Sequence, residues 1–322
     1  MRSPHVCERS WPQPRRGIVG EGGLKGRKRG NGEMTAGLGG RRHDGPLRSG
    51  ADDGLYKLAG WITERDRTIC RLLYDHQVLT TSQVADIGFG SLRRAQQRLS
   101  VLYAAEVVDR FRPRFWPGSG LHHFVLGRVG ARVIAAQRGV EVAELHWHRN
   151  AGENLATSGQ LAHLVGCNGF FSSLMRRARL RDDAELVEWW SERRCAAAWG
   201  KAVIPDGYGI WVEGAQRLPF LFEYDRGTER LSRLEAKLPG YAALARAAKH
   251  PTWVLFCFLS QGREAAARRV LAHPEVPVAT AALAPGQAPD EAVWLAVGET
   301  GPRRRLADLG HPARGLELTR PR

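Results

Sequence analysis

Two apolar runs near the middle of the chain, each carrying carboxylates, constrain the fold more than any other feature. The first run contains Pro205 and Asp206, and the second contains Glu223 and ends at Asp225. A turn-rich segment separates the runs, so we expect them to form adjacent strands. Glu223 and Asp225 are two residues apart and therefore point to the same face of their strand. The pattern predicts that Asp206, Glu223 and Asp225 converge on one patch.

Three converging carboxylates repel one another unless a cation lies between them. A hard divalent ion such as Mg²⁺ takes oxygen ligands of this kind, so Mg²⁺ is the expected cofactor at Asp206, Glu223 and Asp225. The alternative is structural, because Pro-Asp-Gly is a common turn and the residues after Asp225 suit a strand-to-helix loop. Glu223 fits that alternative least well, since it lies inside an apolar run and a buried carboxylate is costly without a partner.

The charge of the chain points to a polyanionic partner. The 322 residues carry a formal net charge of +15, which favours double-stranded DNA as the partner, ahead of an anionic membrane surface. No apolar run approaches the roughly 20 residues that a spanning helix needs, so no membrane partner is expected. The five cysteines are scattered without a CxxC pair, which is typical of reduced thiols in a cytoplasmic protein.

Composition and the residues typical of turns and helix ends divide the chain into two folded domains and their flanking segments. We expect a disordered basic tail, within which Met34 is an alternative start of translation, then a DNA-binding domain, a connector, a nuclease-like domain and a basic C-terminal tail. Their predicted bounds are, in that order, 1–57, 58–140, 141–151, 152–300 and 301–322.

The first domain is predicted to contain three helices followed by a strand pair. Thr63 precedes acidic residues as a helix N-cap does, a short helix follows at 81–87, and Ser91 can cap a third helix. An inward apolar stripe on the third helix comprises Leu92, Ala95, Leu99 and Leu102. Strands at 107–111 and 123–126 flank a basic loop. This order predicts a winged helix-turn-helix.

Polar and basic residues of that domain are the predicted nucleic-acid contacts. In a winged helix the third helix enters the major groove, and basic residues of the hairpin loop reach phosphates. The predicted contacts are Arg93, Arg94, Gln97 and Arg98 on the helix, and Arg112 and Arg114 in the loop. The alternative is a helical interaction domain whose arginines are merely solvated.

The second domain alternates helical and strand-like patterns. A long helix is expected at 152–180 and another at 228–248, with a third at 263–271. The expected strands are 184–190, 203–212, 218–224, 252–259, 276–282 and 292–297. These elements predict a mixed central sheet, so the chain as a whole is predicted to be α+β.

The predicted order is helix, three strands, helix and strand, with Pro-Asp on the second strand and Glu223 on the third. This order resembles the PD-(D/E)xK nuclease superfamily. The resemblance implies a restriction-endonuclease-like α/β fold in which Asp206 and Glu223 bind Mg²⁺. The family's lysine, two residues after the glutamate, is replaced here by Asp225. Some members carry the lysine on the following helix, which implies Lys237 as the fourth catalytic residue.

A second resemblance covers residues 63–259. Glu223 begins the string Glu-Tyr-Asp-Arg-Gly-Thr-Glu, and Lys237 and Tyr241 follow it; together with the winged helix they resemble the replication-relaxation family of bacterial plasmid and mobile-element proteins. The resemblance implies DNA binding and plasmid replication or mobilisation proteins as partners. Two functions stay open: a DNA-binding protein whose nuclease-like domain is catalytically silent, and a Mg²⁺-dependent DNA endonuclease or nickase.

Overall fold

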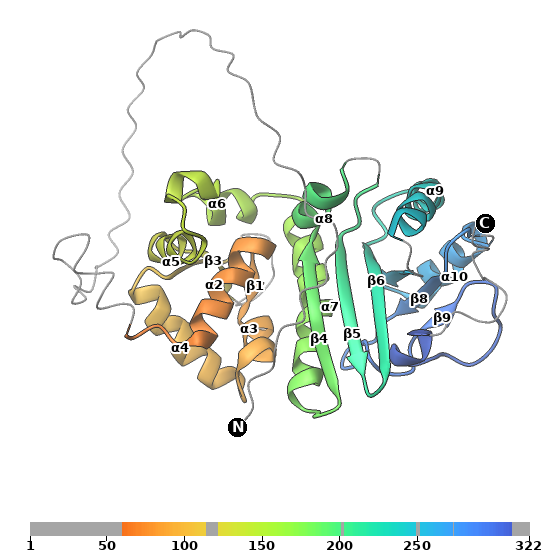
Figure 1. Ribbon diagram of the computed structural model, residues 1–322, viewed down its shortest axis with the longest axis horizontal. Coiled ribbons are helices and arrows are strands. Elements are labelled where there is room, and N and C mark those ends of the chain that lie inside the picture. Colours follow the sequence, from red (N-terminus) through yellow and green to blue (C-terminus); the bar gives the residue numbers. More distant parts are fainter. Residues whose placement is uncertain (1–59, 114–121, 201–202, 249–251, 273, 311–322) are drawn as a thin grey trace, which may run out of the picture.

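The computed structural model describes residues 60–113, 122–200, 203–248, 252–272 and 274–310. A mainly helical N-terminal unit lies beside a six-stranded mixed sheet, and one long helix runs between them (Figure 1). The chain is therefore α+β, as predicted. The expected tail at 1–57 lies outside the described residues.

Each helix of the N-terminal unit starts at a local capping signal. The unit comprises α2 (Glu64–His76), β1 (Leu79–Thr80), α3 (Thr81–Gly88), α4 (Leu92–Ala104), β2 (Val108–Phe111), β3 (His123–Leu126) and α5 (Arg128–Arg138). The Thr63 side chain accepts a hydrogen bond from the backbone of Asp66, whose carboxylate bonds back to Thr63, and Ser91 caps α4. The three strands pair antiparallel in the order β1-β3-β2. β1 was not predicted.

Helix α4 buries one stripe and exposes the rest of its surface. Ala95, Leu99 and Leu102 are buried, as predicted. Leu92 is 42% exposed, so its assignment to the inward stripe was wrong. It occupies the first position of α4.

The predicted helix over 152–180 is two helices. They are α6 (Ala151–Ala156) and α7 (Leu161–Arg179), which follow a 3₁₀ turn η1 (Val142–Leu145). The chain breaks at 157–160, whereas Gly166 lies inside α7. A Cβ atom on Gly166 would overlap the Tyr224 ring, so glycine lets α7 pack closely against the sheet.

Helix α7 joins the two units through hydrogen bonds to both. The Asn168 amide donates to the carbonyls of His76, at 3.2 Å, and Val78, at 2.6 Å. Gln83 of α3 donates to the Val165 carbonyl at 2.7 Å. These three bonds attach α7, which packs against the large sheet, to the N-terminal unit.

The second unit is built around a sheet with strand order β4-β5-β6-β7-β8-β9. Its elements are β4 (Ala184–Ser191), α8 (Glu192–Trp199), β5 (Gly207–Glu213), β6 (Gln216–Asp225), α9 (Leu231–Ala248), β7 (Trp253–Phe258), α10 (Gln261–Val270), β8 (Val278–Ala282), β9 (Leu295–Ala296) and the 3₁₀ turn η2 (Ala307–Gly310). Strands β4, β5 and β6 pair antiparallel, β6, β7 and β8 pair parallel, and β9 is antiparallel to β8. The mixed sheet was predicted, but α8 was not.

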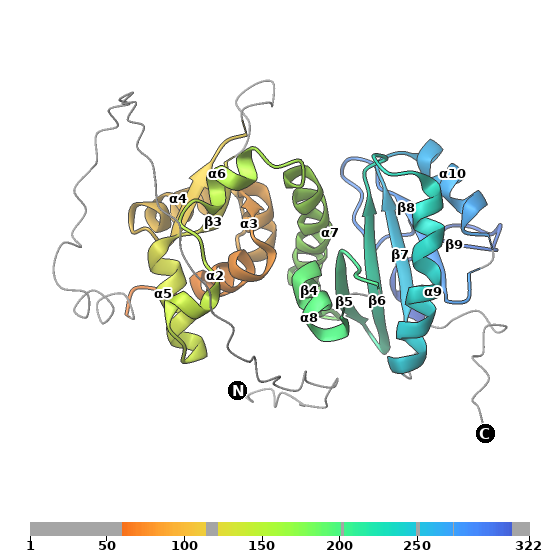
Figure 2. The same cartoon turned by 90° about the horizontal axis from the view of Figure 1, so that it is seen from above.

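Helices cover both faces of this sheet, with α7 on one side and α9 on the other (Figure 2). Alternate residues of β6 serve the two cores: Phe220 and Phe222 pack with α7, and Leu221 packs with α9. Glu223 falls on the α9 side of this alternation. A carboxylate is thereby directed into an apolar layer.

The first part of the basic tail predicted at 301–322 is folded. Leu306 and Leu309 are fully buried in the core on the α7 side of the sheet, and Arg303 forms an ion pair with the buried Glu264 at 2.8 Å. Residues 301–310 therefore belong to the folded unit, and 311–322 lie outside the described residues. No helix in the described ranges is long and apolar enough to cross a membrane.

Candidate functional site

The structure brings Asp206 and Glu223 together at one end of the central strands. Asp206 directly precedes β5, and the antiparallel register pairs the next residue, Gly207, with Phe222 of β6. Continuing that register places Asp206 opposite Glu223. The Tyr224 backbone N–H donates to Oδ2 of Asp206 at 2.8 Å, which fixes the Asp206 carboxylate against the end of β6.

Helix α9 supplies a cation and a hydroxyl to Glu223. The Lys237 ammonium lies 2.5 Å from Oε2 of Glu223, and the Tyr241 hydroxyl donates to Oε1. Lys237 and Tyr241 are four residues apart, so they occupy one face of the helix. The lysine expected beside the glutamate thus reaches it from the following helix.

Burial and the contact between Glu223 and Lys237 shift the pKa values of these two residues in opposite directions. Burial raises the pKa of Glu223 and the charge of Asp206 raises it further; Lys237 and Tyr241 lower it by less, so this pKa lies above its usual value. Burial lowers the pKa of Lys237, but the charge and hydrogen bond of Glu223 outweigh that effect, so the pKa lies above its usual value. The raised pKa of Glu223 favours a neutral carboxyl, whereas the 2.5 Å contact with Lys237 has the length of a charge-assisted hydrogen bond; on this geometry we interpret the pair as ionised.

Asp225 does not join the other two carboxylates. Its Oδ2 accepts from Nε of Arg263 on α10 at 3.1 Å, and its Oδ1 accepts from the Gly227 backbone N–H at 2.5 Å. Asp225 thereby holds the loop after β6 against α10. The predicted convergence holds for Asp206 and Glu223, while Asp225 is committed to Arg263.

Three further residues near Asp206 were missed by sequence reasoning. His163 of α7 places Nε2 3.1 Å from Oδ2 of Asp206, and this hydrogen bond raises the pKa of His163. Cys167 lies one turn later on α7, with Sγ 3.5 Å from the same ring nitrogen. Glu192, at the start of α8, is exposed, and desolvation followed by the charge of Asp206 raises its pKa.

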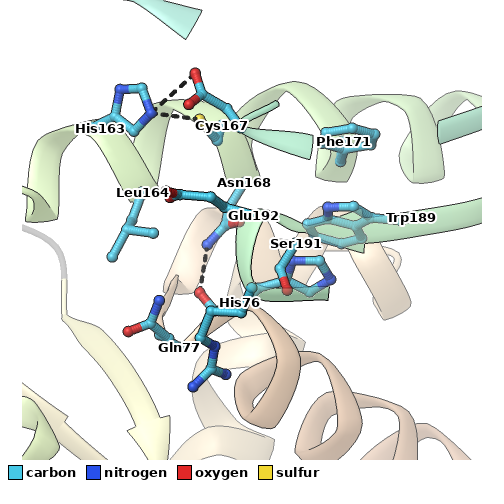
Figure 3. Close-up of a pocket in the computed structure, with 12 residues that line it drawn as sticks. His76, Gln77, His163, Leu164, Cys167, Asn168, Phe171, Trp189, Ser191 and Glu192 are labelled. Atoms are coloured by element: carbon cyan, nitrogen blue, oxygen red, sulfur yellow. Dashed lines mark hydrogen bonds and ion pairs between the residues drawn. The ribbon is translucent and has the colours of Figure 1, made fainter. Parts of the chain in front are cut away.

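A narrow cavity of about 20 Å³ lies beside this group (Figure 3). His163, Asp206 and Glu192 line its polar part, and Trp189 and Phe171 line its apolar part. The volume is close to that of a single water-sized probe, so the cavity holds about one small ligand.

On helix α4 the predicted nucleic-acid contacts fall into two groups. Arg93, Arg94 and Gln97 are exposed, and neither arginine has a carboxylate partner among the residues that the structure describes. Arg98 is instead committed to the protein: its Nη2 lies 2.5 Å from Oδ2 of the buried Asp66, and its guanidinium stacks over Trp61 at 4.5 Å. The exposed face of α4 is therefore smaller than predicted.

The pKa of Asp66 shows how closely it depends on Arg98. Burial raises that pKa, but the hydrogen bonds from Arg98 and Thr63 lower it by more, so the carboxylate stays ionised. In the hairpin, Arg112 is exposed and its Nη2 lies 3.0 Å from Nε2 of His122. Arg114 lies outside the described residues.

Residues 70–253 match the sequence profile of a known family, described as replication-relaxation. This match covers more than half of the 322-residue chain. The chain belongs to the replication-relaxation family. Neither the curated proteins nor the solved structures contain a significant match. Membership suggests a role in the replication or relaxation of plasmids or mobile elements.

The replication-relaxation match spans α4 and most of the acidic site. It includes Asp206, Glu223 and Lys237, and also the missed residues His163 and Glu192, but it ends before Arg263. One signal in the sequence was available for a missed pair, since His163 and Cys167 have the i, i+4 spacing that places two side chains on one helix face. Glu192 had no such signal, because only the fold brings α8 to this end of the sheet.

Proposed function

We propose that this replication-relaxation protein binds double-stranded DNA through α4, in the replication or relaxation of a plasmid or mobile element. The proposal is carried by Arg93 and Arg94, two exposed cations that have no carboxylate partner among the described residues. A cation with no partner in the protein remains available to a phosphate. The net charge of +15 supports the same conclusion.

The arrangement around α4 supports a winged helix-turn-helix. Helices α2, α3 and α4 precede the antiparallel pair β2–β3, and β1 completes the small sheet. Figures 1 and 2 both place α4 on the side of the N-terminal unit away from the large sheet. In this class of domain the third helix enters the major groove, and its outward residues here are Arg93 and Gln97.

A salt titration tests the assignment to α4. Arg93→Ala combined with Arg94→Ala is expected to weaken binding to a fluorescent duplex and to reduce the slope of log K against log salt by about 2, because two phosphate contacts are lost. Arg233→Ala combined with Arg246→Ala removes the same charge from exposed positions of α9 and serves as the control. Equal slopes for the two double variants would remove α4 as the binding surface.

A second candidate function is metal-dependent cleavage of a DNA phosphodiester, and the contact of Lys237 with Glu223 favours it. The order α7, three antiparallel strands, α9 and parallel β7, apart from the inserted α8, supports the resemblance to the PD-(D/E)xK superfamily. In that superfamily a lysine accompanies the acidic pair. Here Lys237 occupies this position from α9.

The residues present fit Mg²⁺ at two of the three predicted positions. Asp206 and Glu223 are neighbours whose charges oppose each other, and a hard cation between them would relieve that repulsion. Asp225 pairs with Arg263 of α10 and does not join Asp206, whereas Glu223, although it pairs with Lys237, lies beside Asp206. Bound Mg²⁺ would polarise a phosphoryl oxygen and lower the pKa of a bound water.

Among Asp206, Glu223 and Lys237, the group most accessible to an incoming phosphate is Lys237. The side chains of Lys237 and Asp206 are 31% and 14% exposed, whereas that of Glu223 is 4% exposed. Lys237 places a positive charge at the surface of the acidic pair, where it can stabilise the negative charge of a phosphate. Glu223 holds Lys237 in that position.

Nicking of supercoiled plasmid in Mg²⁺ or Mn²⁺ tests this second candidate. Activity is expected to disappear in Asp206→Asn and in Glu223→Gln, and to persist in Glu235→Gln, which changes an exposed carboxylate of α9. If the unsubstituted protein nicks no plasmid at any metal concentration, the cleavage proposal fails and DNA binding remains. If nicking survives both site substitutions, the activity does not belong to this site.

A further inference from the structure

The group formed by His163, Cys167 and Asp206 has the geometry of a transition-metal site. His163 and Cys167 lie one turn apart on α7, and Asp206 approaches them from the start of β5. One donor atom from each residue lies within 4.8 Å of the other two. Figure 3 shows both contacts meeting at a single ring nitrogen of His163, one to the sulfur and one to a carboxylate oxygen.

The two separations from His163 match the edges of a tetrahedral zinc site. Zinc bonds of about 2.0 Å to nitrogen or oxygen and about 2.3 Å to sulfur place nitrogen and sulfur roughly 3.5 Å apart, and nitrogen and oxygen roughly 3.3 Å apart. The observed distances from Nε2 of His163 are 3.5 Å to Sγ of Cys167 and 3.1 Å to Oδ2 of Asp206. Only small shifts are needed for an ion to fit.

We propose that His163, Cys167 and Asp206 bind a borderline-soft divalent ion of the Zn²⁺ class, through Nε2, Sγ and a carboxylate oxygen. A thiolate ligand selects against Mg²⁺, which prefers oxygen donors and more of them. The proposal shares Asp206 with the cleavage site described above but does not depend on cleavage or on DNA binding.

The surroundings of the group support an open coordination position. The cavity of about 20 Å³ adjoins the three side chains and holds about one water. Three protein ligands with one free position are typical of zinc sites that act on a substrate, whereas structural sites use four. The Tyr224 N–H, at 2.8 Å from Oδ2 of Asp206, orients the carboxylate as outer partners of metal ligands do.

Cobalt absorption tests the proposal on the full chain, after treatment with a chelator. Co²⁺ is expected to bind with one equivalent per chain and to produce a thiolate-to-metal charge-transfer band, which Zn²⁺ then abolishes by displacement. Cys167→Ala removes the band, because the sulfur ligand is lost. Cys257→Ala is the matched control: it changes another buried cysteine, on β7, outside the group, and keeps the band.

Separate variants test the other two ligands and guard against misfolding. His163→Ala and Asp206→Asn are each expected to weaken Co²⁺ binding more than about 100-fold, beyond the 10–100-fold typical of losing only an outer partner. On the unsubstituted protein, Zn²⁺ raises Tm and an equal concentration of Mg²⁺ does not. A missing charge-transfer band, its persistence in Cys167→Ala, or no effect of Zn²⁺ on Tm would overturn the proposal, whatever the plasmid assay shows.

Discussion

Charged side chains are exposed to solvent on the outer face of α4, whereas at the site around Glu223 the carboxylate is buried and paired. Arg93 and Arg94 lie in solvent without carboxylate partners in the described part of the chain. Glu223 lies inside the protein, and Lys237 and Tyr241 bond both of its oxygens. An exposed charge stays hydrated at little cost, whereas a buried charge is tolerated only with a partner.

Because of this difference, we expect substitutions at the two places to change different properties of the protein. Substitutions on the outer face of α4 are expected to change the affinity for an external polyanion and to leave stability unaltered. Substitutions at the buried pair are expected to change stability even without a ligand. Arg98 tests the distinction within one helix, because it belongs to α4 but pairs with the buried Asp66.

The largest effect is expected from removing the partner of Glu223. Lys237→Met leaves a buried carboxylate with only the Tyr241 hydroxyl, so the free energy of unfolding should fall by about 4 kcal/mol, the range typical of a broken buried ion pair. Urea unfolding at neutral pH measures it. Arg233→Met, on the exposed side of the same helix, should cost less than about 0.5 kcal/mol. Equal losses of unfolding free energy in Lys237→Met and Arg233→Met would show that the buried pair contributes no more to stability than an exposed one.

Arg98→Ala should rank next. The substitution removes the two hydrogen bonds that Arg98 donates to Asp66, while those that Thr63 donates remain. We therefore expect the free energy of unfolding to fall by about 3 kcal/mol. Arg94→Ala, four residues earlier on α4, should lie within about 0.5 kcal/mol of the unsubstituted protein. A larger cost for Arg94 than for Arg98 would contradict the division of α4 into a structural and a binding face.

A smaller, pH-dependent effect is expected at the junction of the two units. His76 is buried and stacks on Trp189 at a ring separation of 3.9 Å. Burial, aided by the charges of Arg193 and Arg194, lowers the pKa of His76 to about 3. Above pH about 6.5 both the folded and the unfolded chain hold this ring neutral.

As the pH falls below that value, the unfolded chain binds a proton at His76 and the folded chain does not, so the free energy of unfolding decreases. The contribution between pH 7.5 and pH 5 is about 2 kcal/mol. His76→Phe keeps an aromatic ring against Trp189 and should remove this part of the pH dependence in urea unfolding. His148→Phe, at an exposed position, should not. Identical pH profiles for His76→Phe and the unsubstituted protein would refute the burial argument.

The sequence by itself determined most of the elements and the central acidic pair. Capping signals at Thr63 and Ser91 marked helix starts, since they depend on residues within one turn. Alternating and continuous apolar runs marked the principal strands, and the adjacency of Asp206 and Glu223 followed from the short connection between their strands. The motif around Glu223 that resembles the replication-relaxation family was likewise recognisable from the sequence.

The tertiary structure alone decided which charges meet. Lys237 reaches Glu223 because α9 packs back across the sheet, and Arg263 takes Asp225 because α10 lies beside the end of β6. His163 and Cys167 join Asp206 only because α7 packs against the opposite face at the close approach of Gly166. Local patterns record hydrogen bonding and burial along the chain, but the choice of ionic partner depends on distances between elements that are remote in sequence.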